Sequence, residues 1–400
     1  MDVYIARQPI FDRNLKVFGY ELLYRQNKQN FFTGVNDDQA TSELIYNTFV
    51  IMEPKEITGG ALAFINFSKD LIDSDIPYLL PPKDIVVEVL ERNEANQATV
   101  EACKKLRSKG YTIALDDFIF DKENSPLIEF ADIIKVEYPA VDIATHQGLI
   151  KQYGSRIKFL AEKIETREDF NNAVKMGYDF FQGYFFSKPA MLDSKEIESF
   201  DVNILNVVRE LSQKEPNFYV ISDIIERDMG LSYKLLKLVN SVYYGAKSRI
   251  KDIHQALVYI GSNELYQWFS LMMLKNVQNI ENAEIIKLSL IRGKLMEFMA
   301  VELGCKDKME YFFTGIFSFI DVLLNKPIEK IMDSLPLSDS VKQALLGNDN
   351  EHRKFLDCVI ACESADWGAI EHRHPMDRIG VKKFMDLYIE SLKWAERLNY

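Results

Sequence analysis

Residues 85–117 decide the fold of the first half of this chain, because they hold two β-rich runs with a helical pattern between them. The first run is Ile85-Val86-Val87-Glu88-Val89-Leu90, and the second is Thr112-Ile113-Ala114-Leu115-Asp116-Asp117. The helical pattern covers Asn93–Ser108, and Gly110 stands where a helix should end. This order of strand, helix and strand predicts a βαβ unit with parallel strands.

The same alternation extends from this unit in both directions, up to about residue 190. The other candidate strands are Val3–Ala6, Gly19–Leu23, Leu62–Phe67, Ile133–Val136, Ile157–Leu160 and Phe180–Phe181. The other helical segments are Asp37–Met52, Ala140–Tyr153 and Arg167–Met176, with Gly177 where the last should stop. We expect these units to close into an α/β barrel of the TIM type.

The second half of the chain has a different rhythm, because amphipathic helical patterns follow one another after Pro189 with hardly any strand-like run between them. These patterns include Ile221–Asp228, Tyr233–Val239, Ile253–Ile260 and Glu264–Leu274. A chain of 400 residues also exceeds the size at which one core keeps growing. The sequence therefore predicts a barrel domain at 1–192 and an all-α domain at 200–400.

Composition excludes several classes of protein. The net charge of -12 argues against non-specific binding to a nucleic acid polymer, which needs clustered Lys and Arg. No apolar run approaches the roughly 18 residues that a membrane span requires, and Met1–Ile10 lacks the pattern of a signal peptide. The four cysteines show no spacing typical of a disulfide framework or zinc site. We expect a cytoplasmic protein without a membrane partner.

Nearly every candidate strand of the first half ends on, or just before, a polar residue that can hold a metal or a phosphate. These residues are Glu21, Asn66, Glu88, Asp116, Lys135, Glu162 and Gln182. A charged residue where one strand meets solvent means little by itself. In a βα barrel, however, the carboxyl ends of the strands converge on one face, so the seven side chains would share a pocket.

The chemistry of these residues favours metal binding, because buried carboxylates are costly unless a cation compensates them. Carboxylate and amide oxygens are hard ligands that suit Mg²⁺ or Mn²⁺, and no His or Cys stands among them. Two such ions about 4 Å apart would suit phosphodiester hydrolysis.

The same residues carry a resemblance to EAL domains, which covers roughly residues 1 to 190. The matching motifs, in the order seen in that family, are Gln8-Pro9-Ile10, Glu21-Leu22-Leu23-Tyr24-Arg25, Phe64-Ile65-Asn66-Phe67-Ser68, Glu88-Val89-Leu90-Glu91, Asp116-Asp117-Phe118, Ile134-Lys135-Val136-Glu137, Ala161-Glu162-Lys163-Ile164-Glu165-Thr166 and Gln182-Gly183-Tyr184-Phe185-Phe186. Each motif is weak alone, and together they are specific.

The resemblance implies a role for each residue in the hydrolysis of cyclic di-GMP. The implied ligands of the first metal are Glu21, Asn66, Glu88 and Asp116, and Asp117 is placed for the second. Glu162 resembles the general base, and Lys135 would hold the attacking water or neutralise the phosphoryl charge. Positioning roles fall to Glu91, Glu165 and Gln182. Arg25 resembles the family's ligand arginine, and Gln8 is placed to touch the nucleotide.

This chain departs from the EAL pattern in two places. Leu22 stands where the family usually has Ala, and the Trp that commonly follows Arg25 is absent. The loop after the paired aspartates, Phe118–Pro126, lacks the glycines of the family's flexible loop, so it cannot adopt the same backbone conformations. In the family this loop couples metal binding to dimerisation, so its replacement leaves the ligand set intact but leaves open both turnover and the formation of a homodimer.

The second half resembles HDOD domains, relatives of HD-type phosphohydrolases that have lost the metal ligands. The resemblance rests on Ile221–Ile225, on Leu235–Gly245 and on Ile253–Leu257 leading to Ile260-Gly261. No His-Asp dipeptide occurs in the chain, so we expect no hydrolysis by this half. An EAL-like domain followed by an HDOD domain is the arrangement of a known group of bacterial signalling proteins, which implies a protein partner for the helical half.

Two hypotheses follow. In the first, the barrel is a two-metal phosphodiesterase that opens cyclic di-GMP to the linear dinucleotide pGpG. In the second, the barrel is a non-catalytic receptor or scaffold, and the helical half engages a protein partner.

Overall fold

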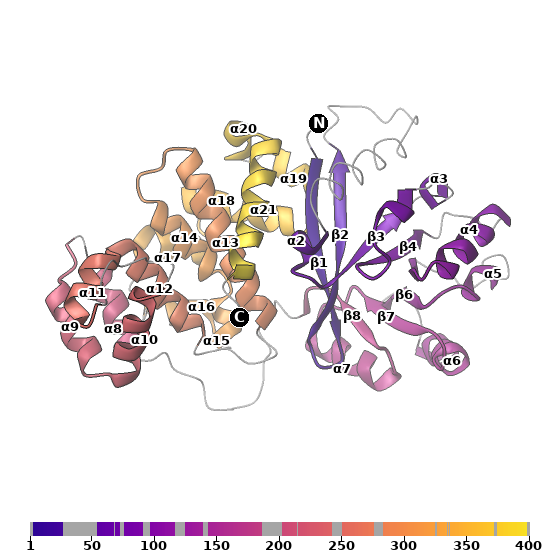
Figure 1. Ribbon diagram of the computed structural model, residues 1–400, viewed down its shortest axis with the longest axis horizontal. Helices are drawn as coiled ribbons and strands as arrows, with labels where there is room; N and C mark the ends of the chain where they lie inside the picture. Colours follow the sequence, from indigo (N-terminus) through magenta and orange to yellow (C-terminus); the bar gives the residue numbers. More distant parts are fainter. Residues whose placement is uncertain are drawn as a thin grey trace. The chain divides into compact units, whose positions relative to one another are not determined.

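The computed structural model describes residues 3–26, 54–67, 69–72, 76–90, 97–116, 125–138, 143–185, 202–213, 215–241, 250–275, 283–324, 326–333, 335, 337–371 and 374–397. The chain forms two compact units (Figure 1). The first comprises Met1–Lys188, Val301–Gly304 and Lys354–Tyr400, and the second comprises Pro189–Ala300 and Cys305–Arg353.

The first unit is built on a closed barrel whose strands follow one another in sequence order. The strands are β1 (Val3–Asp12), β2 (Val17–Gln26), β3 (Leu62–Phe67), β4 (Ile85–Leu90), β5 (Thr112–Asp116), β6 (Ile133–Glu137), β7 (Lys158–Glu162) and β8 (Phe180–Gln182). Each of them overlaps a predicted strand, although β1 and β2 are longer than predicted, so the prediction of a barrel is confirmed.

One strand corrects the prediction of a wholly parallel sheet. β1 is antiparallel to both of its neighbours, β2 and β8, whereas β2 to β8 run parallel. The physical reason is the connection between β1 and β2, a turn at 13–16 that is too short for the crossover that parallel strands need. Asp12 stabilises this turn, because its Oδ1 accepts hydrogen bonds from the backbone N–H groups of Asn14, at 2.8 Å, and Lys16, at 2.9 Å.

Helices connect the remaining strands. They are α2 (Pro54–Thr58), α3 (Lys69–Ile72), the 3₁₀ turn η2 (Ile76–Leu79), α4 (Gln97–Ser108), α5 (Ser125–Ile128), α6 (Ile143–Tyr153) and α7 (Arg167–Met176). α7 has its predicted bounds, because Thr166 caps its first turn and Gly177 ends it at a φ of 107° that favours glycine. The predicted helix at Asp37–Met52 lies outside the described residues.

The interior of the barrel contains an apolar layer. Its buried members are Ile10, Phe64, Val86, Ala114, Ile133 and Leu160, and Phe180 packs against them. Side chains of a strand alternate between its two faces, so the residue two positions further along each strand points into the same interior. On β3 to β8 these next residues are Asn66, Glu88, Asp116, Lys135, Glu162 and Gln182. The apolar layer therefore forms the floor of a polar layer at the carboxyl ends of the strands.

The second unit is helical, and its described part contains no strand, as predicted. Its helices are α8 (Val202–Leu211), α9 (Phe218–Glu226), α10 (Met229–Val239), α11 (Ile253–Ile260), α12 (Ser262–Lys275), most of α13 (Ala283–Glu302), α14 (Lys308–Ile316), α15 (Ile320–Leu324), α16 (Ile328–Met332) and α17 (Asp339–Leu345). Asn217, Asp228 and Asp252 cap α9, α10 and α11 with their side chains. Across the described residues of both units, no helix is long and apolar enough to cross a membrane.

The last helices of the chain belong mainly to the barrel unit. They are α18 (Glu351–Glu363), α19 (Trp367–Glu371), α20 (Met376–Ile379) and α21 (Val381–Arg397). α21 packs on β1 and α2. The compact units therefore divide the chain differently from the predicted domains after residue 353, and the boundaries 1–192 and 200–400 stay a prediction about the sequence.

Candidate active site at the carboxyl ends of the barrel strands

Lys135 lies at the centre of the polar layer. Its ammonium Nζ is 3.2 Å from Glu21 Oε2, 2.8 Å from Glu88 Oε1, 3.0 Å from Asp116 Oδ1 and 3.1 Å from Glu162 Oε1. The Lys135 side chain is fully buried. Burial by itself would lower the pKa of Lys135, but the surrounding carboxylates outweigh it and hold the pKa well above its usual value. The ammonium is therefore charged throughout the physiological pH range.

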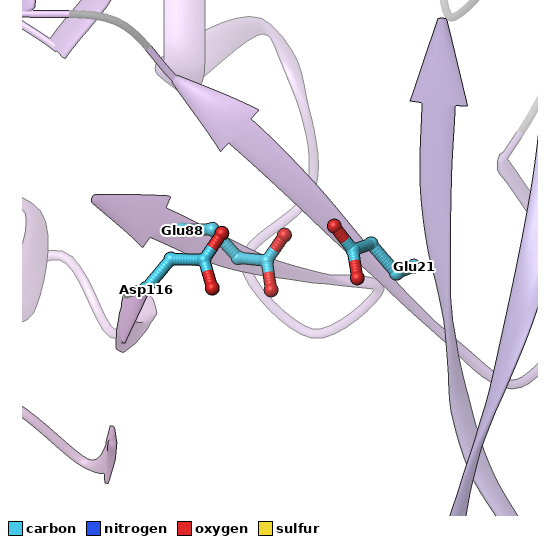
Figure 2. A group of neighbouring side chains, drawn as sticks. All are labelled: Glu21, Glu88 and Asp116. Atoms are coloured by element: carbon cyan, nitrogen blue, oxygen red, sulfur yellow. The ribbon is translucent and has the colours of Figure 1, made fainter. Parts of the chain in front are cut away.

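Three of these carboxylates form a cluster that can hold a metal ion. Glu21, Glu88 and Asp116 each offer one oxygen, and the three oxygens lie within 4.8 Å of one another. Figure 2 shows the three side chains, which extend from β2, β4 and β5 with their carboxylates turned toward a common space. All three residues are buried. The expectation that an acidic group gathers at this end of the barrel is therefore met.

Glu21 is fixed by hydrogen bonds from two amide side chains. Asn66 Nδ2 donates to Glu21 Oε1 at 3.0 Å, and Gln182 Nε2 donates to Glu21 Oε2 at 2.7 Å. Burial would raise the pKa of Glu21, but the Lys135 charge and these hydrogen bonds outweigh burial and lower the pKa below its ordinary value. Glu21 is thus ionised and oriented before any ligand arrives.

Glu88 has the opposite electrostatic setting. Its side chain is fully buried, the Lys135 ammonium lies 2.8 Å from Oε1, and Oε2 has no hydrogen-bond donor among the described residues. Burial, together with the nearby Glu21 and Asp116, raises the pKa of Glu88 well above its ordinary value despite Lys135. The side-chain oxygen of Asn66 is likewise buried without a donor in the described part of the chain. Such acceptors without donors are costly, and a cation would relieve the cost.

Glu162 borders the cluster on β7. Burial raises its pKa to about 7, an effect that Lys135 opposes and that Asp116 and Glu21 reinforce. A carboxyl group with this pKa exchanges its proton near neutral pH, which is the property of a general acid or base.

The donor set fits a divalent cation. Three carboxylates and the Asn66 amide supply hard oxygen ligands, and together they include buried oxygens without hydrogen-bond donors. Counted with Glu162, four carboxyl groups surround one ammonium, so the group carries a net charge of −3 when all are ionised. The acidic cluster is therefore able to hold a metal ion.

For the other predicted site residues, the structure shows fewer contacts with the pocket. Gln8 is half-buried and is paired across the strands with Glu21, so it shares the interior face. Glu165 is exposed. Arg25 lies in β2 opposite Tyr4, and only its backbone is described. Two predicted residues, Glu91 and Asp117, lie outside the described residues.

Two features near the pocket were not assigned roles from the sequence. Lys163, directly after Glu162, has a φ of 56°, and its ammonium lies 2.7 Å from Glu137 Oε2. Glu137 is paired with Glu162 in the sheet. Arg7, next to Gln8, is buried on the outer side of β1. The sequence could have indicated a buried Arg7, because a charged residue stands there within a largely apolar strand. No sequence pattern indicated the backbone conformation of Lys163.

Two family models match this chain. The EAL domain model matches residues 64–189, and the HDOD domain model matches residues 197–333. The segment that carries Gln8, Glu21 and Arg25 precedes the EAL match.

Two bacterial proteins are similar to the chain over nearly its full length. YuxH of Bacillus subtilis, described as uncharacterised, is 36% identical over 408 residues, which cover 100% of this chain and 99% of YuxH. CdgJ of Vibrio cholerae, named a cyclic di-GMP phosphodiesterase, is 33% identical over 402 residues, which cover 99% of this chain and 93% of CdgJ.

Solved structures of EAL proteins are more distant. YkuI of Bacillus subtilis, in complex with cyclic di-GMP and calcium, is 20% identical, with a TM-score of 0.40 over 48% of this chain and 57% of YkuI. A standalone EAL protein of Vibrio cholerae, bound to cyclic di-GMP, is 22% identical, with a TM-score of 0.37 over 47% of this chain and 92% of that protein.

Proposed function

This chain belongs to the family of proteins that join an EAL domain to an HDOD domain, and we propose that its barrel binds cyclic di-GMP and hydrolyses it to linear pGpG. The observation that carries this proposal is the set of carboxyl groups around Lys135. The relative CdgJ, whose name states this activity, supports the choice of substrate.

The charge of the pocket makes metal ions part of the proposal. A cyclic dinucleotide carries two phosphodiester anions, and a pocket whose net charge reaches −3 when its four carboxyl groups are ionised repels them unless cations intervene. We therefore propose two Mg²⁺ or Mn²⁺ ions. Their proposed ligands are Glu21, Asn66, Glu88 and Asp116 for the first ion, with Asp117 for the second. Bound ions of this kind neutralise phosphoryl charge and make a water molecule more acidic.

The side chains of the protein then have distinct tasks. Glu162, with a pKa of about 7, accepts the proton of the attacking water near neutral pH. The water oxygen bonds to phosphorus while the P–O3′ bond breaks, and the released 3′ oxygen takes a proton from solvent. Lys135 keeps the carboxylates together and offers positive charge to the phosphoryl oxygens.

The remaining predicted residues complete this proposal. Gln182 positions Glu21 through its hydrogen bond of 2.7 Å. Glu91 and Glu165 keep the positioning roles that the EAL resemblance implies. Arg25 and Gln8 are proposed to contact the nucleotide, for which a guanidinium group is well suited.

The proposal extends to the helical unit and to the setting of the protein. On the family resemblance, the HDOD unit would bind a protein partner, the chain would form a homodimer, and the protein would act in the cytoplasm. A pull-down with the purified HDOD-containing chain and measurement of the molar mass in solution test the first two parts.

One assay tests the phosphodiesterase. Purified full-length protein is incubated with cyclic di-GMP and Mg²⁺ or Mn²⁺, and the products are separated by chromatography. We expect pGpG from the wild type and none from Glu21→Ala. Absence of product above the Glu21→Ala control would refute hydrolysis. If calorimetry on the same sample then shows binding at micromolar ligand, the barrel is a receptor, and no binding would leave a scaffold.

A further inference from the structure

A buried arginine lies directly behind the pocket. Gln8 and Ile10 of β1 face the barrel interior, so Arg7, one position away, faces outward. Its side chain is nevertheless only 2% exposed. A guanidinium group stays charged at any physiological pH, and burial of such a charge requires compensation.

Three contacts from different elements compensate this charge. The Arg7 guanidinium carbon lies 4.3 Å from the centre of the Tyr20 ring on β2, and Nη1 donates a hydrogen bond to the Ile57 carbonyl of α2. Nη1 also lies 3.9 Å from Glu396 Oε1, near the end of α21. Tyr20 is buried and directly precedes Glu21. Glu21 is the member of the acidic cluster that accepts hydrogen bonds from Asn66 and Gln182. Arg7 therefore joins the C-terminal helix to the strand that carries Glu21.

The C-terminal helix α21 covers a part of the barrel that has no crossover helix of its own. In a βα barrel the crossover helices cover the outer faces of the strands, but β1 and β2 are joined by a turn and not by a helix. α21 packs on β1 instead, and in Figure 1 it is the yellow helix beside α2 and β1.

Polar contacts along α21 show that this packing is specific. The Ile5 backbone N–H donates to Met385 Sδ at 3.3 Å, and Lys393 Nζ lies 2.8 Å from Glu56 Oε2 on α2. A side chain at Gly59 would collide with the Glu396 carboxylate, so the glycine allows that carboxylate to approach.

We infer that Arg7 is a positioning residue for the carboxylate pocket and that Glu396 of the C-terminal helix holds it in place. When Glu396 is replaced by an uncharged residue, the buried guanidinium loses a compensating partner and is drawn toward solvent. It then leaves the Tyr20 ring and the Ile57 carbonyl, and the strand segment with Glu21 loosens. The importance of Glu21 as a metal ligand rests on the proposed function, whereas the contact between α21 and the strand does not.

The test uses the full-length protein with Glu396→Gln and a matched control, Lys393→Gln. Both substitutions remove one charge from α21 where this helix packs on β1 and α2, but of the two residues Glu396 is the one that faces Arg7. Hydrogen–deuterium exchange of peptides from residues 17–26 reports on the strand. We expect exchange about fivefold faster in Glu396→Gln and a change below about twofold in Lys393→Gln.

A second readout is the affinity for Mn²⁺, measured by calorimetry without nucleotide at a temperature at which every variant is folded. We expect Glu396→Gln and Arg7→Lys to weaken Mn²⁺ binding about three- to tenfold, because lysine cannot stack and bond as the guanidinium does. Lys393→Gln should bind Mn²⁺ as the wild type does.

The outcomes separate this inference from the proposed function. Exchange at the wild-type rate in Glu396→Gln, or equal acceleration in Glu396→Gln and Lys393→Gln, overturns the positioning role. A wild type that binds no Mn²⁺ refutes the metal site, and the exchange measurement then still decides whether Glu396 holds the strand.

Discussion

Buried charges are handled differently in the two units of this protein. In the helical unit, buried Glu297 has an ammonium partner, with Lys294 Nζ at 2.9 Å, and Gln267 Nε2 donates to it at 3.2 Å. In the barrel, four carboxyl groups share the single ammonium of Lys135. The Glu297 site is thus balanced by one ammonium, whereas the group around Lys135 has more carboxyl groups than cations, which favours the binding of a further cation. An unbalanced buried cluster is a better indicator of a binding site than a buried charge by itself.

The most severe test of this comparison removes the shared ammonium. Lys135→Met leaves the carboxyl groups without their cation, so we expect the free energy of unfolding of the metal-free protein to fall by about 3–5 kcal/mol at pH 8. The matched variant Lys294→Met should cost only about 1 kcal/mol, because it leaves a single carboxylate without its ammonium and Glu297 keeps the Gln267 hydrogen bond. Urea unfolding measures both, and equal losses would contradict the comparison.

Glu162→Gln separates activity from stability. Removing the proposed base should reduce the hydrolysis of cyclic di-GMP by at least about a hundredfold. The pKa of Glu162 in the folded protein, about 7, exceeds its ordinary value of 4.5, so the folded state binds this proton more tightly than the unfolded state does. The contribution of Glu162 to stability is therefore fully present below about pH 4.5 and is lost as the pH rises to 7.

The variant should consequently stabilise the metal-free protein at pH 8, by about 1–3 kcal/mol, and change it little at pH 4.5. Glu137→Gln is the control, because Glu137 is paired with Glu162 in the sheet but its side chain is half-buried and its carboxylate is paired with Lys163. Urea unfolding at the two pH values without metal provides the measurement. A stabilisation that does not depend on pH would rule out this account of Glu162.

Helix packing, and not charge, should limit the stability of the helical unit. Gly315 of α14 lies against the backbone of Gly293 in α13, where an added Cβ would overlap the neighbouring helix. We expect Gly315→Ala to lower the free energy of unfolding by about 1–3 kcal/mol. Gly148→Ala in α6, where a Cβ would meet nothing within 4 Å, should instead stabilise by up to about 1 kcal/mol. Thermal unfolding of the two variants tests this, and similar shifts in both would refute it.

The smallest effect is expected from Glu297→Gln. The amide keeps the shape of the side chain and can still accept from Gln267, so the cost should be about 1 kcal/mol and Mn²⁺ affinity should be unchanged. Glu88→Gln, in contrast, should weaken Mn²⁺ binding by about 10- to 100-fold. Calorimetry with Mn²⁺ compares the two, and a marked loss of affinity in Glu297→Gln would mean that the helical unit also contributes to metal binding.

Much of the fold could be predicted because it is encoded locally. The bounds of α7 follow from Thr166 and Gly177, and those of α11 from the apolar period of Ile253–Ile260, since caps and periodicity depend on neighbouring residues. The polar layer could also be anticipated, because Glu88 and Asp116 each stand at or near the carboxyl end of a predicted strand. The metal-ligand and catalytic roles of these residues remain predictions.

The sequence by itself determined the strands, the helices and the row of polar residues that meets at one end of the barrel, since alternation along a strand fixes which side chains share a face. Only the tertiary structure decided that Lys135 stands among four carboxyl groups and that α21 covers β1, where Arg7 and Glu396 meet. These features depend on residues far apart in the chain. They form because the outer face of β1 must be covered and buried charges must be compensated. Neither requirement produces a pattern in neighbouring residues of the sequence.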